Sequence, residues 1–321
     1  MMARTLALSV VVCTRERPDD LERCLVALGA QRAPLEVIVV DNAPRTGRTR
    51  AVATRAGVRY VVEPRPGLDC ARNAGLRAAT APVVAYTDDD AVADPEWAEA
   101  LLAALDDQSV TAVAGAILPF EIETEAQRLF ERYLRGEAGR RDQGKRRIFV
   151  APFPPAAAGH VGAGANMAFR RDALEALGGF DEAFDAGTLT RSGGDTEMFA
   201  RLLGAGARLV YEPGAVVRHR HRRELRELRE QLFGYGVGVY AFWMHRVLRH
   251  RDVQAARFAA GTFFRHGGRR LRRSALHRPD ELPLALVLAE LLGCLYGPIA
   301  YLRARRRAGA PPAMQGGSAS P

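Results

Sequence analysis

The stretch VVAYTDDDAV, residues 83–92, runs an apolar segment directly into three consecutive carboxylates, Asp88, Asp89 and Asp90. Like charges at one strand end repel one another unless a cation or a helix N-terminus offsets them. Side chains alternate across a strand, so Asp88 and Asp90 point to the same side and can reach one divalent ion. The stretch therefore predicts a buried strand that ends at a site for Mg²⁺ or Mn²⁺, with a diphosphate as a further ligand. Alternatively, the cluster caps the next helix, for which Asp94 before Pro95 is the better N-cap.

Similar apolar runs come before this strand in the chain. They are LALSVVVC (6–13), LEVIVVDN (35–42) and VRYVVE (58–63), and segments with helical spacing separate them. Runs that are apolar throughout are typical of parallel strands covered on both faces, so we expect a doubly wound, mainly parallel α/β sheet flanked by helices. Ligands of such sheets bind at the carboxyl ends of the strands, where Thr14 and Asp41 are expected to meet the acidic cluster.

Charge is unevenly distributed along the 321 residues, whose net charge is +9. Residues 215–321 contain 20 Arg, no Lys and 7 Asp or Glu, a balance of +13, so the remainder carries −4. The four cysteines show no CxxC pairing, as expected for free thiols in a reducing compartment. The apolar N-terminus imitates a signal peptide but lacks a small-residue cleavage site, so a cytoplasmic location is expected.

The pattern of the second half predicts a different organisation. Residues 119–158 read as an amphipathic helix followed by a lid loop, and 265–279 as an Arg-rich loop. The apolar segment 282–302 is long enough to span a membrane, but Glu290 lies inside it. A helix lying on an anionic membrane surface, a spanning helix and a helix packed in the protein remain alternatives. We expect a catalytic domain at 1–220, a helical, Arg-rich, membrane-associated extension at 221–308 and a disordered tail at 309–321.

Several classes of protein can be weighed from motifs. A dehydrogenase and a P-loop enzyme are disfavoured because no glycine follows the first strand in SVVVCTRERP. A sugar nucleotidyltransferase remains an alternative, although no Gly-rich triphosphate loop is found near the N-terminus. A non-enzymatic basic protein that binds membranes or nucleic acid is another alternative. We expect no nucleic acid partner, because the aromatic residues of FGYGVGVYAFWMHR are spaced as in a packed helix.

The order of the motifs is more specific than any one of them. The chain runs through LSVVVCTRERP, VIVVDN, GLDCARNAGLRAAT, TDDD, GAGANMAFRR and GGDTEMFARLLGAGARLVYEP. This ordered set resembles the family 2 glycosyltransferases, which have the GT-A fold, over about residues 5–220. The resemblance implies a metal-dependent inverting transfer of a sugar from a nucleotide sugar to a hydroxyl acceptor. UDP is the nucleotide it favours, with GDP and dTDP as alternatives.

The resemblance also assigns residues. It places Thr14, Arg15, Glu16 and Asp41 at the nucleotide base and ribose, and Arg72 and Asn73 at the nucleotide sugar. It places Asp88 and Asp89 at the donor, and Asp88 and Asp90 on the metal. The acceptor or donor-sugar loop is implied to contain Ala165, Asn166 and Met167.

Asp195 corresponds to the general base of the family's Glu-Asp pair. Gly194 stands where the family has Glu, so Glu197 is a second catalytic candidate. The dipole of the following helix would lower the pKa of Asp195, and helix capping alone could also explain this residue. His219 is the candidate third metal ligand, with His221 as the alternative and a solvated strand end as the other explanation.

The basic, apolar C-terminal third points to a membrane nearby. We therefore expect a protein that is peripheral at the inner face of the cell membrane. A lipid-linked or cell-envelope glycan is the acceptor that this location favours.

Overall fold

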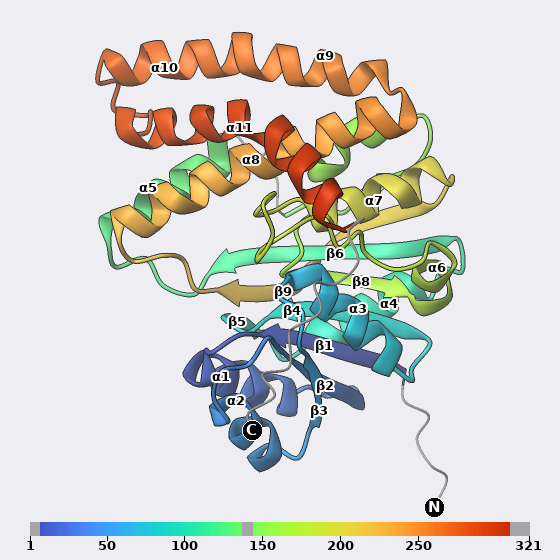
Figure 1. Ribbon diagram of the computed structural model, residues 1–321. Helices are drawn as coiled ribbons and strands as arrows, with labels where there is room; N and C mark the ends of the chain where they lie inside the picture. Colours follow the sequence, from blue (N-terminus) through green and yellow to red (C-terminus); the bar gives the residue numbers. More distant parts are fainter. Residues whose placement is uncertain (1–6, 137–143, 309–321) are drawn as a thin grey trace, which may run out of the picture.

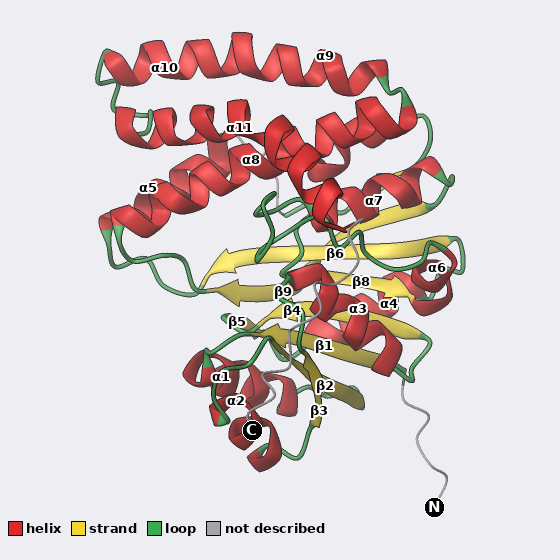
Figure 2. Cartoon of the chain, in the orientation of Figure 1, coloured by secondary structure: helices red, strands yellow, loops and turns green. Residues whose placement is uncertain are grey.

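The computed structural model describes residues 7–136 and 144–308. The tail predicted at 309–321 and part of the predicted lid, 137–143, lie outside the described residues. Within the described ranges, one central sheet carries helices on its faces, and a set of long helices lies beside it at the top of Figure 1. Figure 2 shows the same layers by element type.

The sheet has the strand order β3-β2-β1-β4-β8-β6-β9-β5, and β7 pairs with β9. The pairs β1–β2, β1–β4, β2–β3 and β6–β9 are parallel, whereas β8, β5 and β7 pair antiparallel with their neighbours. The predicted α/β class with a mainly parallel sheet is confirmed. The strands are β1 (Leu8–Thr14), β2 (Leu35–Asn42), β3 (Arg59–Glu63), β4 (Val83–Asp88), β5 (Ala91–Ala93), β6 (Val110–Pro119), β7 (Arg147–Phe149), β8 (Asn166–Arg170) and β9 (Arg208–His219).

The helices follow the amphipathic segments of the sequence, and two of them contribute directly to the site described below. The N-terminus of α3 and that of α7 both lie beside the glycine-rich loop before β8. The helices are α1 (Pro18–Gly29), α2 (Arg48–Arg55), α3 (Leu68–Ala78), α4 (Trp97–Leu105), α5 (Glu125–Gly136), the 3-10 helix η2 (Pro155–His160), α6 (Arg171–Ala176), α7 (Gly194–Gly204), α8 (Leu225–His250), α9 (Val253–Gly261), the π-helix η3 (Thr262–Gly267), α10 (Gly268–Ala275) and α11 (Leu284–Ala308).

Both faces of the sheet are buried at its centre, which explains why a central strand such as β1 is apolar at nearly every position. Val11 of β1 belongs to one apolar cluster, whereas its neighbours Val10 and Val12 belong to the cluster on the opposite face. All three side chains are fully buried. Since side chains alternate along a strand, a strand covered on both sides needs apolar residues at every position.

Two expectations about local structure were wrong. Asp94 does not cap α4, whose N-cap is Glu96, because the Asp94 carboxylate instead pairs with Arg218 of β9 at 3.1 Å. The Arg-rich segment 265–279 is not a loop, since most of it lies in η3 and α10. The long, unbranched side chain of arginine is compatible with a helix, and within this segment Arg270 is buried through its ion pairs with Glu281 and Glu290.

The helices α8 and α11 pack so closely that glycine is required at their contact. A Cβ atom at Gly293 of α11 would lie 2.1 Å from the carbonyl oxygen of Phe233 in α8, and one at Gly236 would lie 2.2 Å from that of Glu290. Glu290, the charge inside the apolar segment, accepts hydrogen bonds from Arg270 at 2.6 Å and from Tyr133 at 3.0 Å. One face of α11 is therefore buried against the protein. The domain boundary at residue 220 stays a prediction.

Candidate active site

The strand ends converge as expected at the switch in strand order beside β1. Thr14 stands opposite Asp41 in the β1–β2 register, and Cys13 stands opposite Asp88 in the β1–β4 register. Because these strands run parallel, their carboxyl ends lie at one edge of the sheet. Residues separated by more than 70 positions in the sequence thus share one site.

The acidic turn after β4 meets a histidine from the end of β9. The short strand β5 pairs with β9 so that Ala91 stands opposite His219. The Nε2 atom of His219 lies 3.0 Å from Asp90 Oδ1 and 3.7 Å from Asp88 Oδ2. His221, the alternative ligand, points elsewhere, since its Nε2 atom lies 2.8 Å from Glu131 Oε1.

Positive groups offset the repulsion among the three carboxylates. Arg17 Nη1 donates to Asp89 Oδ1 at 3.3 Å and to Asp90 Oδ2 at 3.1 Å, and Thr14 Oγ1 donates to Asp89 Oδ2 at 2.7 Å. Burial and the charge of Asp90 raise the pKa of Asp89 to about 7. Burial alone would lower the pKa of His219, but Asp90 and Asp88 raise it to about 10. Asp89 is thus anchored within the protein, while Asp88 and Asp90 face the histidine.

This donor set fits a divalent cation. The ligand atoms of Asp88, Asp90 and His219 all lie within 4.8 Å of one another. Two carboxylate oxygens and one imidazole nitrogen suit Mn²⁺, and the nitrogen makes the set less favourable for Mg²⁺.

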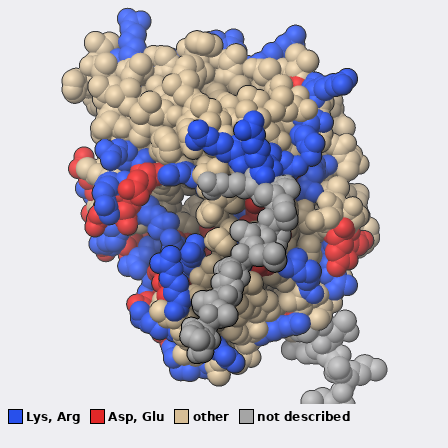
Figure 3. All heavy atoms as spheres, in the orientation of Figure 1, with Lys and Arg blue, Asp and Glu red and all other residues tan. Residues whose placement is uncertain are grey.

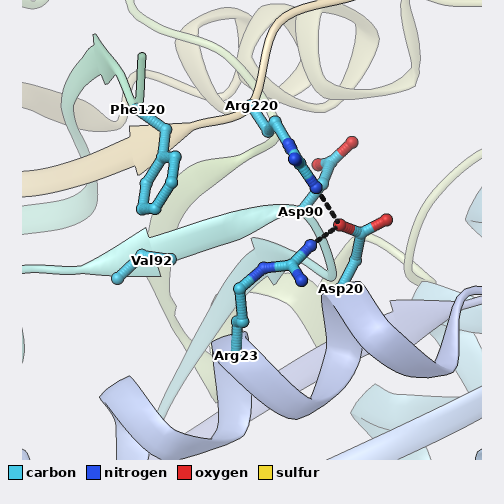
Figure 4. Close-up of a pocket in the computed structure, with 6 residues that line it drawn as sticks. All are labelled: Asp20, Arg23, Asp90, Val92, Phe120 and Arg220. Carbon is cyan, nitrogen blue, oxygen red and sulfur yellow. Dashed lines mark hydrogen bonds and ion pairs between the residues drawn. The ribbon is translucent and has the colours of Figure 1, made fainter.

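A small pocket adjoins the cluster on its outer side. Figure 4 shows Arg23 and Arg220 converging on Asp20, beside Asp90. Arg220 Nη1 lies 3.5 Å from Asp20 Oδ1, and Arg23 also pairs with Asp20. Val92 and Phe120 form the apolar wall. The carboxylates of Asp20, Asp90 and Glu121 balance the charge of the two guanidinium groups here.

The residues assigned to the nucleotide base lie next to this edge. Asp41 is fully buried, and its Oδ2 atom accepts a hydrogen bond from Tyr60 at 2.8 Å. Its Oδ1 atom is buried without a hydrogen-bond partner among the described residues. Burial raises the pKa of Asp41. Arg15 is exposed, whereas Glu16 accepts from the backbone N–H groups of Arg45 and Thr46 and so holds the loop after β2.

Arg72 and Asn73 differ in what their side chains contact. Arg72 Nη1 donates to Asp69 and to Asp185, at 2.8 Å in each case, and the side chain is buried. Both ends of the Asn73 amide bind the backbone of Phe180, at 3.0 Å and 2.7 Å. Asn73 therefore holds the loop before α7, while the charge of Arg72 lies within reach of Asp185, Asp69, Asp195 and Asp88.

Asp195 is held in a defined orientation at the start of α7. Its Oδ2 atom accepts from the Gly164 N–H at 2.6 Å and its Oδ1 atom from the Thr196 N–H at 2.6 Å. The expected lowering of its pKa was wrong, because burial and the charge of Asp185 raise the pKa despite the helix dipole. Glu197 lies elsewhere on α7, where its carboxylate binds Arg201 at 2.8 Å and borders a separate hollow that includes His245.

Residues 165–167, at the start of β8, contact the surrounding protein rather than an open site. Asn166 is fully buried, accepts from Trp97 at 2.8 Å and donates to the carbonyl groups of Ala116 and Ala215. Met167 is also fully buried, and the carbonyl group of Ala165 accepts from Thr87 at 3.0 Å. These residues fix the glycine-rich loop before β8, which presents Gly164 to Asp195.

Three further residues of this region were not among the sequence candidates. Arg17 neutralises the acidic turn, and Asp69 and Asp185 hold Arg72. Asp69 precedes Arg72 by three positions on a helix, a spacing that places the two side chains on one face. That spacing could have identified Asp69, whereas no local signal marks Arg17 or Asp185.

The fold and the site together define a class of protein. A doubly wound, mainly parallel sheet that carries, at its strand ends, an acidic turn whose donor set fits a divalent cation is the GT-A arrangement. The structure is similar to that of a mannosyltransferase from Pyrobaculum calidifontis, solved in complex with GDP-Man and Mn²⁺. The TM-score is 0.56 at 21% identity, over 96% of this chain and 77% of the other.

Sequence comparison identifies the family. The family model of glycosyl transferase family 2 matches residues 9–178. The chain is 31% identical over 259 residues to the pre-mycofactocin glycosyltransferase of Mycobacterium tuberculosis, covering 79% of this chain and 50% of that protein. It is 30% identical over 228 residues to the succinoglycan biosynthesis protein ExoM of Rhizobium meliloti, covering 68% of each. The chain belongs to glycosyl transferase family 2, and it spans about half the length of the mycobacterial relative.

Proposed function

We propose that this chain transfers a sugar from a nucleoside-diphosphate sugar to a hydroxyl acceptor, with inversion at the anomeric carbon and with Mn²⁺ or Mg²⁺. The observation that carries the proposal is the cluster of Asp88, Asp90 and His219 at the strand ends, beside a pocket lined by Arg23 and Arg220. Membership of the family and the GDP-Man complex of the Pyrobaculum calidifontis protein support it.

The proposed binding mode assigns residues of the site to the diphosphate and to the nucleotide base of the donor. Asp88, Asp90 and His219 would hold the ion, which when bound neutralises charge on the leaving diphosphate. Arg23 and Arg220, which pair with Asp20 in this structure, would offer guanidinium N–H donors to the diphosphate beside the ion. Asp41, whose buried Oδ1 atom lacks a partner among the described residues, would accept a hydrogen bond from the nucleotide base.

The proposed general base is Asp195. The N–H groups of Gly164 and Thr196 hold its carboxylate, and Arg72 lies nearby as a fixed positive charge. Asp195 would accept the proton of the acceptor hydroxyl while that oxygen attacks the sugar from the face opposite the diphosphate, which inverts the configuration. Glu197 is the weaker candidate because its carboxylate is bound to Arg201.

Metal removal tests the proposed function. Titration of the purified chain with UDP, GDP and dTDP by calorimetry should give binding of one nucleotide in Mn²⁺ and a loss of at least about tenfold in affinity with excess chelator. The same conditions with candidate nucleotide sugars and a hydroxyl acceptor should release that nucleotide. Equal affinity with and without chelator would contradict the metal-dependent binding mode.

We further propose that the partner surface is an anionic membrane and that the acceptor is lipid-linked or belongs to the cell envelope. The outer face of α11 carries six large apolar side chains between 41% and 59% exposed, which we call the α11 stripe: Leu284, Leu288, Leu292, Leu295, Ile299 and Leu302. In Figure 3 the upper part of the molecule, where Figure 1 places α9, α10 and α11, is mostly free of charged side chains, with a basic band below it.

Basic residues accompany the α11 stripe. The segment 253–279, which contains α9 and α10, has seven Arg and no Asp or Glu, and Phe264 within it is 75% exposed. By length and composition Leu284–Arg306 could cross a membrane, but its opposite face is packed on α8. An apolar stripe bordered by arginines fits insertion into the boundary of an anionic leaflet, which is how we propose the protein lies at the inner face of the cell membrane.

Substitution in the α11 stripe should remove vesicle binding. Leu292→Glu combined with Leu295→Glu is expected to weaken cosedimentation with vesicles of equal parts phosphatidylcholine and phosphatidylglycerol by at least about tenfold, because each buried Leu contributes roughly 1.5 kcal/mol or more. Val26→Glu on α1, at a position 70% exposed, is the matched control and should bind normally. Unchanged binding would oppose the proposal, as would a wild-type dimer in light scattering that dissociates in the double variant.

A further inference from the structure

Asp69 is a buried carboxylate with unused hydrogen-bonding capacity. It lies in the first turn of α3 and is fully buried. Its Oδ1 atom accepts from Arg72 at 2.8 Å, while its Oδ2 atom has no hydrogen-bond partner among the described residues. Burial raises the pKa of Asp69 well above its ordinary range, against the effect of Arg72. A half-satisfied buried carboxylate is costly, so this position requires an explanation.

The Asp69 carboxylate fills the volume next to Gly194. A Cβ atom built at Gly194 would lie 1.9 Å from Asp69 Oδ2 and 2.8 Å from Oδ1. Arg72 holds the carboxylate from the other side, which limits its movement away. Any side chain at position 194, directly before Asp195, is therefore excluded as long as Asp69 is present.

A continuous set of contacts leads from Asp69 to Asp195. Arg72, paired with Asp69 and Asp185, packs against the loop before β8, where a Cβ atom at Gly164 would lie 2.3 Å from Arg72 Nη2. The Gly164 N–H donates to Asp195 Oδ2 at 2.6 Å. Arg72 is thus one of the groups in contact with this loop, and the loop in turn holds the Asp195 carboxylate.

We infer that Asp69 is a positioning residue for Asp195, acting from α3 through Arg72 in the place of a side chain at position 194. This inference rests on the proposed function, in which Asp195 is the base. A carboxyl group that holds Arg72 is required at this place, whereas the position in the chain that supplies it is exchangeable. A carboxylate moved from position 69 to position 194 should therefore restore the function.

The test is an exchange of the carboxylate between the two positions. Asp69→Ala is expected to lower kcat for glycosyl transfer by about tenfold to a hundredfold while the KM for the donor changes little, because the base is misplaced and the donor site is intact. Asp69→Asn, which can still accept from Arg72, should keep more activity than Asp69→Ala. Gly194→Glu alone should fold poorly, and Asp69→Ala with Gly194→Glu should regain most of the lost kcat.

Controls separate positioning from a structural role. Asp172→Ala removes an exposed Asp from the same helical position of α6 and should leave kcat unchanged. Thermal unfolding of each variant identifies any that fail to fold. If folded Asp69→Ala has the kcat of the wild type, or if the double variant has no higher kcat than Asp69→Ala, this inference is overturned while the proposed function stands. Absence of transfer by the wild type with every donor defeats the proposed function and the inference together.

Discussion

Asp90→Asn is expected to abolish metal-dependent nucleotide binding and to lower glycosyl transfer at least about a thousandfold, since a bound metal contributes several kcal/mol to a reaction that expels a diphosphate. Asp90 is the residue of the acidic turn that contacts both positive neighbours, His219 at 3.0 Å and Arg17 at 3.1 Å. The amide has almost the same shape but lacks the charge that binds a hard cation. Calorimetry with Mn²⁺ and the matching nucleotide measures the first effect, and product formation measures the second.

The matched control for Asp90→Asn is Asp94→Asn. Asp94 follows β5, and its carboxylate pairs with Arg218 at 3.1 Å outside the metal cluster. We expect this variant to bind nucleotide and metal as the wild type does. If Asp90→Asn retained metal-dependent binding while remaining folded by circular dichroism, the acidic turn would be structural and the donor site would lie elsewhere.

Asp195→Asn is expected to lower kcat by about a hundredfold to ten-thousandfold, the range typical of a lost general base, with nucleotide affinity unchanged. The amide oxygen can still accept from Gly164, but the amide nitrogen then faces the Thr196 N–H, so the variant loses proton transfer together with one of the two anchoring hydrogen bonds. A base acts in its deprotonated form, and burial raises the pKa of Asp195 above that of an ordinary aspartate. The acidic limb of the wild-type kcat profile should therefore lie above about pH 3.8, and activity should fall as the pH drops through it.

Asp172→Asn and Glu197→Gln complete this experiment. Asp172 occupies the same helical position in α6 that Asp195 occupies in α7, so Asp172→Asn measures the contribution of capping and dipole alone. Glu197→Gln tests the second candidate, and we expect a small effect because Arg201 binds that carboxylate. If Asp195→Asn and Asp172→Asn lowered kcat equally, Asp195 would be a helix cap rather than the base. If Glu197→Gln lowered kcat more than Asp195→Asn does, Glu197 would be the base.

The sequence by itself determined the first four strands of the sheet, whereas β5 to β8 were not among the predicted strands. The predicted strands at 35–42 and 58–63 correspond to β2 and β3, whose bounds differ from the predicted ones by at most one residue. β2 is buried along its second half, and its apolar character there is continuous and local, whereas β3 is an edge strand in which Val62 is 48% exposed. The acidic turn was equally visible, because three adjacent carboxylates at a strand end need a nearby positive charge whatever surrounds them. The order of the motifs then identified the family.

The tertiary structure alone decided which distant residues complete the site. His219 rather than His221 reaches Asp90 because β5 pairs with β9 in one register, and a shift by one residue would turn the side chain to the other face. Arg17 offsets the acidic turn from a loop more than 70 positions away. The pairing of Asp69 with Gly194 depends on how α3 and α7 pack.

The C-terminal helices show the same division between local and long-range information. Composition indicated that 282–302 is an apolar helix, and α11 contains this segment from Leu284 onward. Composition could not indicate that Arg270 and Tyr133 bind Glu290 while the opposite face stays exposed. Apolar periodicity indicates which face of a segment needs to be buried. The element against which that face packs is set by contacts between residues far apart in the chain, and these contacts exist only in the folded structure.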